Sequence, residues 1–338
     1  MFLNWLWPSL KMIYKLFCCS LSLLFFCFNM FWLFCNLAIP WCTITLLIIC
    51  VACKFVKLQR SPNEVHLLSL LNVPSDWPNN DWAIANRGAG YDAPENTRAA
   101  VKKCLARGYR NMLLDAALTS CNEIVIVNRQ NIERAGLSGK ISNHTLGELQ
   151  HLDMTSQHPM GSQYEAESVS TLKQLADFLD SQSTAAILFL RLNDNSACMI
   201  DQVQKFFSTN KIFAQRSIVI SQSPLAIYQL RKLTPEITCG LWHESYLLQS
   251  ILKSSTLVTS VYGAILRNII APVIGISVVF LSKEEFNLHI GELWRNVGVR
   301  PIVYMVNSPN EKRYYQRTMK TQYLTDSLRS EPHLLMKA

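Results

Sequence analysis

Charged side chains are missing from one long stretch near the start of this chain. Between Lys15 and Lys54 lie about 38 residues without a formal charge, rich in Leu, Phe, Cys and Trp. One membrane span needs about 20 apolar residues. We therefore expect a membrane anchor in residues 1–60, spanning about 16–53, as one long tilted helix or as two short helices that meet near Asn36–Pro40. A cleaved signal peptide is disfavoured, because its apolar core is only about 7–15 residues long.

The sequence also lacks the cysteine spacing of a metal site or a disulfide framework. Seven of the 11 cysteines lie in or at the edge of the apolar stretch. There they are interpreted as small lipid-facing residues, with palmitoylation as an alternative. The other four, Cys104, Cys121, Cys198 and Cys239, have no metal-ligand spacing, and they leave the redox compartment open.

No concentrated basic segment, internal repeat or low-complexity tract is present. The net charge is +8, but basic and acidic residues are mixed through the body of the chain. Nucleic acid is therefore not expected as a partner, whereas an anionic membrane surface suits the net charge.

Basic residues flank both ends of the apolar run, at positions 11, 15, 54, 57 and 60. This distribution fits a hairpin with both ends in the cytosol, whereas a single span puts the large domain on the opposite side. The glycosylation sequon Asn143-His144-Thr145 favours a lumenal or extracellular domain. We expect an integral protein of the endoplasmic reticulum or plasma membrane, with the side of the domain undecided.

Beyond the anchor, strand and helix patterns alternate, and helices are expected to begin at the caps Thr97 and Thr171. Alternation over about 250 residues predicts a (β/α)₈ TIM barrel at 81–332, with a doubly wound sheet as the alternative. A linker at 61–80 precedes the barrel and a tail at 333–338 follows it. The expected strands are 82–85, 112–116, 124–127, 185–192, 217–221, 237–241, 277–281 and 301–306.

The apolar segment 257–281 permits more than one interpretation. Arg267, Asn268 and Pro272 interrupt it, and a central arginine is costly in lipid. We expect a buried strand and a hydrophobic loop that touches the membrane, rather than a further transmembrane helix.

The most informative stretch, Ala85 to Ala100, reads A-N-R-G-A-G-Y-D-A-P-E-N-T-R-A-A. Its glycines and the Pro-Glu-Asn sequence predict a strand that ends in a sharp polar loop, followed by a helix from about Thr97. The Arg87 guanidinium suits a phosphate, and the glycines let the backbone approach a ligand. On these residues alone, a strand–helix turn with structural glycines explains the pattern equally well.

The pattern R-G-x-x-x-x-x-P-E-N-T after an apolar strand resembles the first active-site loop of the glycerophosphodiester phosphodiesterase family. Similar order and spacing extend over roughly 82–330, and three later segments resemble the membrane-anchored glycerophosphodiester phosphodiesterase 1 subgroup: Gly275–Glu285, Pro301–Asn307 and Tyr323–Ser327. The resemblance implies a TIM barrel that hydrolyses a phosphodiester at the carboxyl ends of its strands. A divalent cation held by carboxylates would polarise the phosphate, and two histidines would act as general acid and base.

Several residues that the resemblance assigns to this chemistry have changed. The two histidine positions fall on Asn86 and Asn128, so no catalytic pair is intact. Of the metal-ligand positions only Asp115 is acidic, because the others fall on Leu113 and Phe189; a shift of one residue at the last position meets leucine instead. One carboxylate is a poor site for a hard divalent cation.

What remains suits anion binding. The expected phosphate-binding residues are Arg87, Glu95, Asn96 and Arg191, of which Arg191 takes the place of a family lysine. A pocket that has lost acids favours an anion. We expect a membrane-anchored pseudoenzyme of glycerophospholipid metabolism, without a cofactor, that binds a glycerophosphodiester, a lysophospholipid head group or a protein.

Two alternatives stay open. One is a weakly active glycerophosphodiester phosphodiesterase or lysophospholipase D that uses Mg²⁺ or Ca²⁺, with His144, His151 or His243 in place of a missing histidine. The other is a membrane scaffold for a protein partner of unknown identity.

Overall fold

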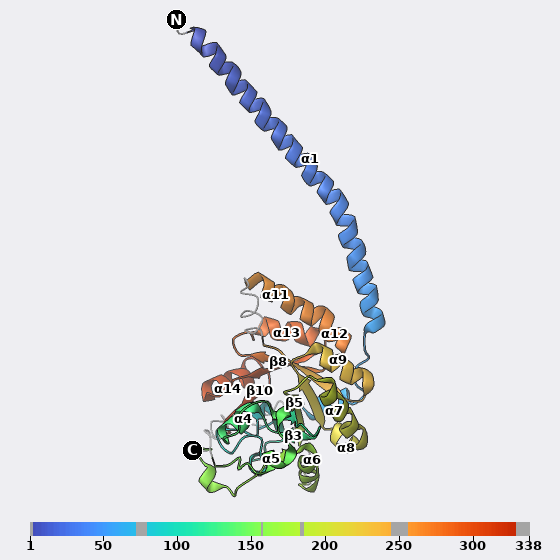
Figure 1. Ribbon diagram of the computed structural model, residues 1–338, viewed down its shortest axis with the longest axis vertical. Coiled ribbons are helices and arrows are strands. Elements are labelled where there is room, and N and C mark those ends of the chain that lie inside the picture. The colour runs from blue at the N-terminus through green and yellow to red at the C-terminus, as the bar shows by residue number, and fades with distance from the viewer. Residues whose placement is uncertain (1–2, 72–79, 157, 183–185, 245–255, 329–338) are drawn as a thin grey trace. The chain divides into compact units, whose positions relative to one another are not determined.

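The computed structural model describes residues 3–71, 80–156, 158–182, 186–244 and 256–328. The chain divides into two compact units, Met1–Val56 and Lys57–Ala338 (Figure 1). The expected tail at 333–338 and residues 72–79 of the expected linker lie outside the described residues.

The first unit is one helix, α1 (Leu3–Val56), of 54 residues. It is continuous through Pro40 rather than split in two, and the Asn36 amide donates to the Trp32 carbonyl (2.8 Å) inside it. Its stretch Leu10–Val56 has 47 residues and a mean hydropathy of 2.1, which is long and apolar enough to cross a membrane. By length and composition it fits a membrane anchor or a signal sequence.

The second unit is a closed barrel of eight parallel strands, as predicted, and not a doubly wound sheet. β1 pairs with both β2 and β10, so the barrel has no free edge at that point. β10 was not among the expected strands, because three residues are too few to show a period of two. The barrel strands are β1 (Ala83–Asn86), β2 (Asn111–Leu118), β5 (Ile187–Leu192), β6 (Ser217–Ser221), β7 (Thr238–Trp242), β8 (Val278–Ser282), β9 (Arg300–Tyr304) and β10 (Tyr323–Thr325).

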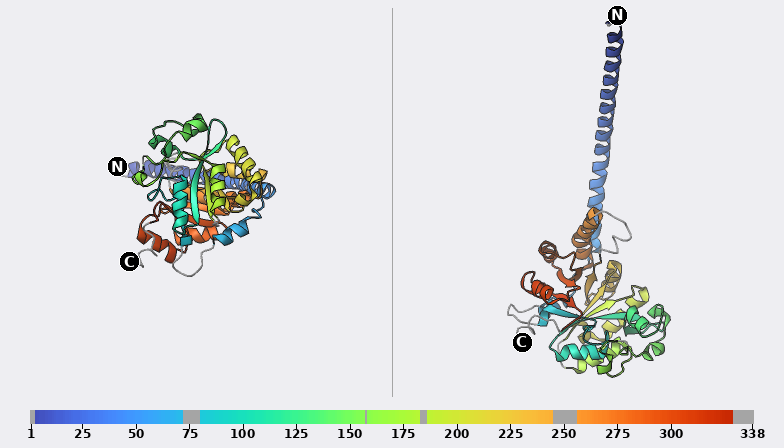
Figure 2. Two further views of the ribbon diagram at one scale, coloured as in Figure 1. Left: turned by 90° about the horizontal axis from the view of Figure 1, so that it is seen from below. Right: turned by 90° about the vertical axis from the view of Figure 1, so that its left-hand side faces the viewer.

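Helices cover the outside of the barrel (Figure 2). The Thr97 side chain accepts from the Ala100 N–H, and Thr171 forms a capping box with Gln174, so both expected caps begin helices. Apolar helix faces pack on the outward side chains of the strands and form the main core. The covering helices are α3 (Arg98–Ala106), α6 (Leu172–Ser181), α7 (Ala197–Thr209), α8 (Lys211–Ala214), α9 (Pro224–Leu233), α11 (Thr256–Ile265), α12 (Ala271–Ile274), α13 (Leu288–Asn296) and α14 (Pro309–Arg317).

Residues 257–281 differ from the expectation of a strand and a loop. The structure has α11, a π-helical turn η4 (Leu266–Ile270) and α12, and only then strand β8. Residues 257–281 are mainly apolar and show no periodicity that separates a helix from a strand, so the sequence pattern did not predict the helices. Pro272 is tolerated because it lies in the first turn of α12.

The strand expected at 124–127 lies outside the barrel. β3 (Ile124–Ile126) pairs antiparallel with β2 and with β4 (Ser170–Thr171). Together with α4 (Arg129–Arg134) and α5 (Leu146–Gln150) it forms an excursion between β2 and β5 that has a small core of its own. The described short turns are η1 (Asn80–Trp82), η2 (Ile141–Asn143) and η3 (Gly161–Gln163).

Residues 57–71 pack against the amino-terminal end of the barrel. The Arg60 guanidinium donates to two backbone carbonyls between α13 and β9 (2.7 Å each). α2 (Glu64–Leu70) follows, and Leu67 and Leu71 are fully buried in the apolar layer inside the barrel. Residues 57–71 therefore belong to the second unit, and they close the amino-terminal end of the barrel.

Candidate functional site

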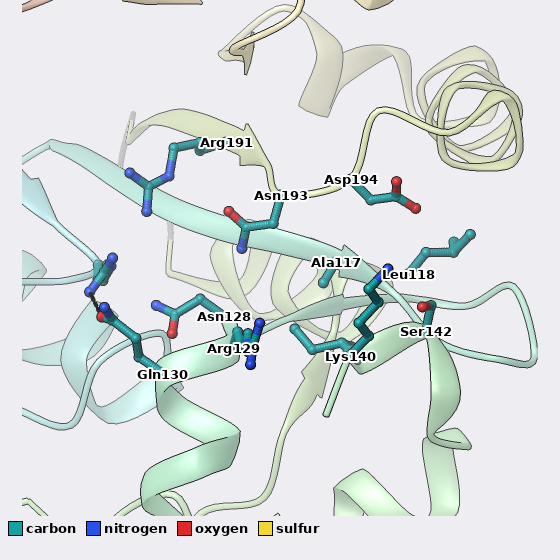
Figure 3. A pocket seen from close by; sticks show the side chains of 12 residues that line it. Ala117, Leu118, Asn128, Arg129, Gln130, Lys140, Ser142, Arg191, Asn193 and Asp194 are labelled. Carbon is teal, nitrogen blue, oxygen red and sulfur yellow. Dashed lines mark hydrogen bonds between the residues drawn. The ribbon is translucent and has the colours of Figure 1, made fainter. Parts of the chain in front are cut away.

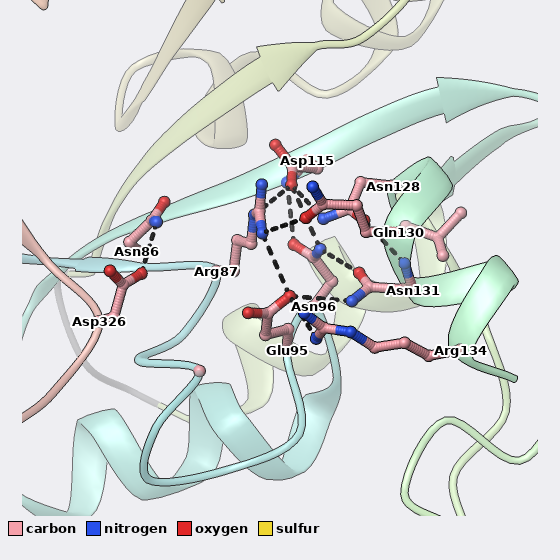
Figure 4. A network of polar contacts seen from close by, with 12 residues as sticks. Asn86, Arg87, Glu95, Asn96, Asp115, Asn128, Gln130, Asn131, Arg134 and Asp326 are labelled. Carbon is pink, nitrogen blue, oxygen red and sulfur yellow. Dashed lines mark hydrogen bonds and ion pairs between the residues drawn. The ribbon is translucent and has the colours of Figure 1, made fainter. Parts of the chain in front are cut away.

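The loop after β1 turns through left-handed backbone. Arg87, Gly88 and Ala89 have φ angles of 53°, 77° and 65°, and Asn96 has a φ of 59°. Such backbone costs a non-glycine residue about 1–2 kcal/mol, and strain of this kind concentrates at functional sites. The Asn96 N–H donates to the Arg87 carbonyl (2.9 Å) and closes the loop, so both side chains reach the carboxyl end of β2 (Figure 4).

Gly88→Ala is expected to destabilise the barrel unit by about 1–3 kcal/mol more than Gly136→Ala, because overpacking of a filled site adds to the backbone strain that both variants share. A Cβ at residue 88 would lie 2.6 Å from the Cβ of Ala100 in α3. Gly136→Ala is the matched control, because residue 136 also has a positive φ (+93°) but has no neighbour within 4 Å of the added Cβ. Urea unfolding followed by near-UV circular dichroism compares the two; equal losses would contradict tight packing of this loop on α3.

Asp115 of β2 is the centre of a buried ionic cluster (Figure 4). Its Oδ1 accepts from Nε of Arg191 (2.6 Å) and lies 2.6 Å from Nη2 of the same guanidinium, and its Oδ2 lies 2.9 Å from Nε of Arg87. Asn128 donates to Oδ2 (2.8 Å), and the Asp115 N–H donates to Oδ1 of Asn96 (3.0 Å). Because Asp115 and Arg191 are direct partners in the β2–β5 ladder, the strand register itself brings the ion pair together.

The charges of this cluster stabilise one another. Burial by itself raises the pKa of the Asp115 carboxyl, but the guanidiniums of Arg191 and Arg87 outweigh it and hold the pKa below its ordinary range. Burial lowers the pKa of the Arg87 guanidinium, whereas the carboxylates of Asp115, Glu95 and Asp326 raise it above its usual value. Asp115 is therefore ionised at neutral pH, and its carboxylate forms ion pairs with both arginines.

Glu95 and Asn96 extend the cluster through Asn131. Oε2 of Glu95 accepts from Nη1 of Arg87 (3.3 Å) and from Nδ2 of Asn131 (2.9 Å), and it lies 3.7 Å from Nη1 of Arg134. Nδ2 of Asn96 donates to Oδ1 of Asn131 (2.7 Å). The structure thus brings the expected phosphate-binding residues together, but Glu95 and Asn96 bond to protein groups.

The two asparagines at the expected histidine positions have different partners. Asn128 caps α4, where its Oδ1 accepts from the Asn131 N–H (2.9 Å), and its amide donates to Asp115. The Asn86 amide donates to Oδ1 of Asp326 (2.7 Å), apart from the Asp115 cluster (Figure 4). A carboxamide does not take up or release a proton near pH 7, so neither position transfers protons.

Leu113 and Phe189 lie in register with Asn86, in the apolar layer inside the barrel. Both are fully buried, and the Phe189 ring meets Phe280 edge-on at 5.8 Å. A hard divalent cation needs several oxygen ligands, whereas the oxygens of Asp115 face two arginines and an asparagine amide, and Leu113 and Phe189 offer only carbon. In the described part of the chain, no three His, Cys, Asp or Glu side chains gather as a metal-binding group. The residues present do not fit Mg²⁺ or Ca²⁺.

An aromatic stack supports Arg191. Its guanidinium lies over the indole of Trp242, 4.6 Å from the ring centroid, which is a favourable cation–π arrangement. Trp242 in turn stacks on Phe280 (5.2 Å) and Tyr304 (4.6 Å). Arg191 is therefore held by the Asp115 carboxylate on one side and by an aromatic face on the other.

A cavity of about 500 Å³ opens beside the Asp115 cluster (Figure 3). Figure 3 shows Arg191 and Asn193 on one wall, with Gln130 and Lys140 on the opposite wall. We call it the basic cavity, because its lining includes four cationic side chains and one acid: Arg87, Arg129, Lys140 and Arg191, with Asp194. This excess of positive charge favours an anionic ligand.

None of the three histidines considered as replacements lines the basic cavity. Nε2 of His144 lies 3.0 Å from the Ser138 carbonyl, and His151 is exposed after α5. His243 follows β7 and lines a separate cavity of about 160 Å³, where its Nε2 lies 3.7 Å from Oε2 of Glu285. Burial lowers the pKa of His243 more than the nearby glutamates raise it, so its ring is neutral at pH 7.

Three polar residues of this site were not predicted from the sequence. Lys140 lines the basic cavity from a loop without any motif, and nothing in the sequence marks it. Asn131 falls in the first turn of a helix capped by Asn128, so recognition of that cap could have placed it. Asp326 follows β10 and bonds to Asn86; treating Tyr323–Ser327 as the last barrel strand would have found it.

Comparisons with known proteins point to one family. The sequence model of the Glycerophosphoryl diester phosphodiesterase family matches residues 87–326. Glycerophosphodiester phosphodiesterase 1 of Bos taurus is 25% identical over 260 residues, covering 73% of this chain and 78% of the relative. The Homo sapiens protein is 24% identical over 267 residues, covering 74% and 80%.

Solved structures share the fold. The glycerophosphodiester phosphodiesterase from Agrobacterium tumefaciens superimposes with a TM-score of 0.57 at 18% identity, covering 76% of this chain and 99% of that one. An Oleispira antarctica phosphodiesterase in complex with the product sn-glycerol-3-phosphate gives 0.58 at 17% identity, covering 75% and 96%. The family match spans most of the barrel and its mouth, and this chain belongs to the glycerophosphoryl diester phosphodiesterase family.

Proposed function

We propose that this chain is a pseudoenzyme of its family, which binds the phosphate of a glycerophosphodiester or a lysophospholipid head group without hydrolysing it. The observation that carries the proposal is the pairing of Asp115 with two arginines. A metal ligand must offer its oxygens to the cation, and here Arg191 and Arg87 occupy both of them. The other expected positions hold two apolar residues, which supply no ligand, and two asparagines, which transfer no proton.

The charge and size of the basic cavity support phosphate binding. Arg87 and Arg191 lie at its wall, and Arg129 and Lys140 add two more cations. Arg129 also pairs with Glu133 (2.7 Å), so Lys140 is the better candidate for a contact that forms only with the ligand. A volume near 500 Å³ lies within the range of small-molecule sites, about 300–1,000 Å³.

The relatives support the same class of ligand. The Oleispira antarctica structure holds sn-glycerol-3-phosphate as a product, and the family is named for glycerophosphoryl diesters. Binding of such a head group needs cations and hydrogen-bond donors, which this chain keeps, whereas cleavage also needs proton transfer. We infer that binding persists here and that cleavage has been lost.

Isothermal titration of the full-length protein with glycerol 3-phosphate tests this proposal. We expect binding that Ca²⁺ and Mg²⁺ leave unchanged. Lys140→Gln should weaken it about fivefold, because one charge a few ångströms from an anion contributes about 1 kcal/mol in water. The control is Lys173→Gln, at an exposed position on α6, which should bind as the wild type does. Binding that requires Ca²⁺, or equal affinities for the two variants, would contradict the proposal.

His243 supports a second candidate, a weakly active glycerophosphodiester phosphodiesterase or lysophospholipase D. The histidine lies at the carboxyl end of β7, where TIM barrels place their catalytic groups. Glu285, 3.7 Å from its Nε2, is placed to orient a neutral imidazole as a general base. This candidate requires measurable turnover that disappears in His243→Ala.

We further propose that α1 anchors the protein in the endoplasmic reticulum or plasma membrane, with the barrel as a lumenal or extracellular domain. The stretch Leu10–Val56 has 47 residues and a mean hydropathy of 2.1, longer than the roughly 20 residues that a span needs, which supports anchoring. The Asn143 side chain of the sequon is exposed on η2, which supports the lumenal side. A glycan on Asn143 in protein from eukaryotic cells would establish that side, and its absence there would count against it.

A further inference from the structure

An apolar helical segment joins β7 to β8 and leaves one face uncovered. Within its described side chains, Val261, Ile265 and Ile269 are 50%, 42% and 41% exposed. A spacing of four residues keeps them on one side of the helix, and we call them the aliphatic stripe. No acidic residue occurs anywhere in 245–283, and the one charged residue within 261–269 is Arg267, a cation that suits anionic lipid head groups.

The opposite face of the segment packs on the barrel. Leu266, Ala271 and Ile274 are almost completely buried in the main core. The segment is therefore fixed in its rotation, and the aliphatic stripe is turned outward by the fold. Figure 1 shows α11 and α12 running along one side of the second unit.

The end of this segment is tied to the chain that leaves the anchor. The Leu58 N–H donates to the Val273 carbonyl (2.8 Å). The Arg231 guanidinium donates to the Gln59 carbonyl (2.6 Å), to the Ile274 carbonyl (3.2 Å) and to the Gly275 carbonyl. The residues on both sides of these four hydrogen bonds belong to the second unit. Residues 58 and 59 are thereby held at the carboxyl end of α12.

The covalent distance from this tie to the anchor is short. Only Lys57 separates Val56, the last residue of α1, from Leu58. Two residues extend the chain by at most about 7 Å. Lys54 and Lys57 are the basic residues expected at the surface of a bilayer that α1 crosses. Along the chain, the residues tied to the end of α12 therefore begin only two positions after the last residue of α1.

We propose that the aliphatic stripe of α11 and η4 lies in the interface of the bilayer that α1 crosses, and gives the barrel a second membrane contact. This inference rests on α1 as the membrane span, which is part of the proposed function. An interfacial helix combines an apolar face turned to the acyl chains with a polar or packed face turned away, and this segment has both.

The second contact also bears on the site. Tyr262 and Leu266 of the same segment line the cavity of about 160 Å³ that follows β7, together with Trp242. The indole of Trp242 lies under the guanidinium of Arg191. Trp242 therefore lies between the membrane-facing segment and Arg191 of the basic cavity.

Photocrosslinking to lipid tests the proposal in the full-length chain. We place p-benzoylphenylalanine at Ile265 in protein reconstituted into nanodiscs of phosphatidylcholine and phosphatidylserine, and measure lipid adducts by mass spectrometry. Leu47 of α1 is the positive control, and Ile212 of α8, an aliphatic that is 73% exposed, is the negative control. We expect adducts at Ile265 at least about tenfold above those at Ile212, as for a side chain that enters the acyl boundary.

A yield at Ile265 no higher than at Ile212, or adducts to protein instead of lipid, would overturn the proposal. The same substitution at Ile269 repeats the measurement, so a folding defect at one position does not decide it. Absence of lipid adducts at Leu47 would overturn the anchor and this inference together. Titration with glycerol 3-phosphate reports on the basic cavity separately, so failure of head-group binding is distinguished from failure of membrane contact.

Discussion

Purified full-length protein is expected to release glycerol 3-phosphate from a glycerophosphodiester at least about 10⁴-fold more slowly than an active relative. A general acid or base contributes roughly 10²–10⁴-fold each, and both expected positions are asparagine, Asn86 and Asn128. The apolar residues Leu113 and Phe189 remove the cation that would polarise the phosphate. The measurement is an enzyme-coupled assay with Ca²⁺ or Mg²⁺ present, and the Oleispira antarctica phosphodiesterase serves as the reference.

A variant that combines Asn86→His, Leu113→Glu, Asn128→His and Phe189→Asp tests the reason for the loss. We expect its release rate to rise with Ca²⁺, whereas the double variant of the two asparagines alone should stay inactive, because its histidines have no cation to work with. Two carboxylates in an apolar layer are costly without a cation, so urea unfolding with and without Ca²⁺ verifies that the variant folds.

Wild-type turnover within about 100-fold of the reference would refute the pseudoenzyme, since the two missing groups alone are worth more than that. If such turnover disappears in His243→Ala, it belongs to that histidine and the second candidate function is correct.

Asp115→Asn should lower the free energy of unfolding of the barrel unit by about 3–5 kcal/mol, as for removal of one partner from a buried ion pair. The change leaves Arg87 and Arg191 without their shared carboxylate. For a unit of this size the melting temperature should fall by roughly 6–20 °C, measured by differential scanning calorimetry. The control is Asp201→Asn, which breaks an exposed pair with Lys205 (2.8 Å) and should cost no more than about 1 kcal/mol.

The loss of stability caused by Asp115→Asn should become smaller as the pH falls below about 4. The folded-state pKa of Asp115 lies below its ordinary value of about 3.9, so its contribution to stability is complete above that pH. The contribution is lost as the pH falls from about 4 through the folded-state pKa. The melting temperatures of wild type and variant should therefore differ at pH 7 and converge in acid. Equal melting temperatures at pH 7 would show that the buried cluster does not stabilise the fold.

Local patterns were sufficient to predict most of the barrel. The strands β5 to β9 lie within two residues of their expected positions, because buried parallel strands appear as apolar runs between polar turns. The helix after Thr97 begins where its cap predicts. β10 and the helical segment Thr256–Ile274 were not predicted, since three residues carry no period and a uniformly apolar run carries none either.

The sequence was sufficient to predict which positions of the candidate site lack a titratable side chain, but not which groups its arginines contact. Asn86 and Asn128 lack a titratable proton wherever they lie, so their effect on proton transfer follows from their identity. The arginines are different, because the same guanidinium serves a ligand or a neighbouring carboxylate depending on what faces it. In the structure Arg87 and Arg191 line the basic cavity and also hold Asp115, which no local pattern indicates.

By itself the sequence determined the barrel, the apolar segment before it and the absence of a titratable side chain at Asn86 and Asn128, because these depend on residue identity and on spacing within short stretches. Only the tertiary structure decided that Asp115 is the counter-ion of two arginines. Arg191 lies 76 positions after Asp115, and Arg87 lies on a different loop. The three meet only because β5 pairs with β2 in the register that sets Arg191 beside Asp115, while the left-handed turn after β1 brings Arg87 to the other oxygen.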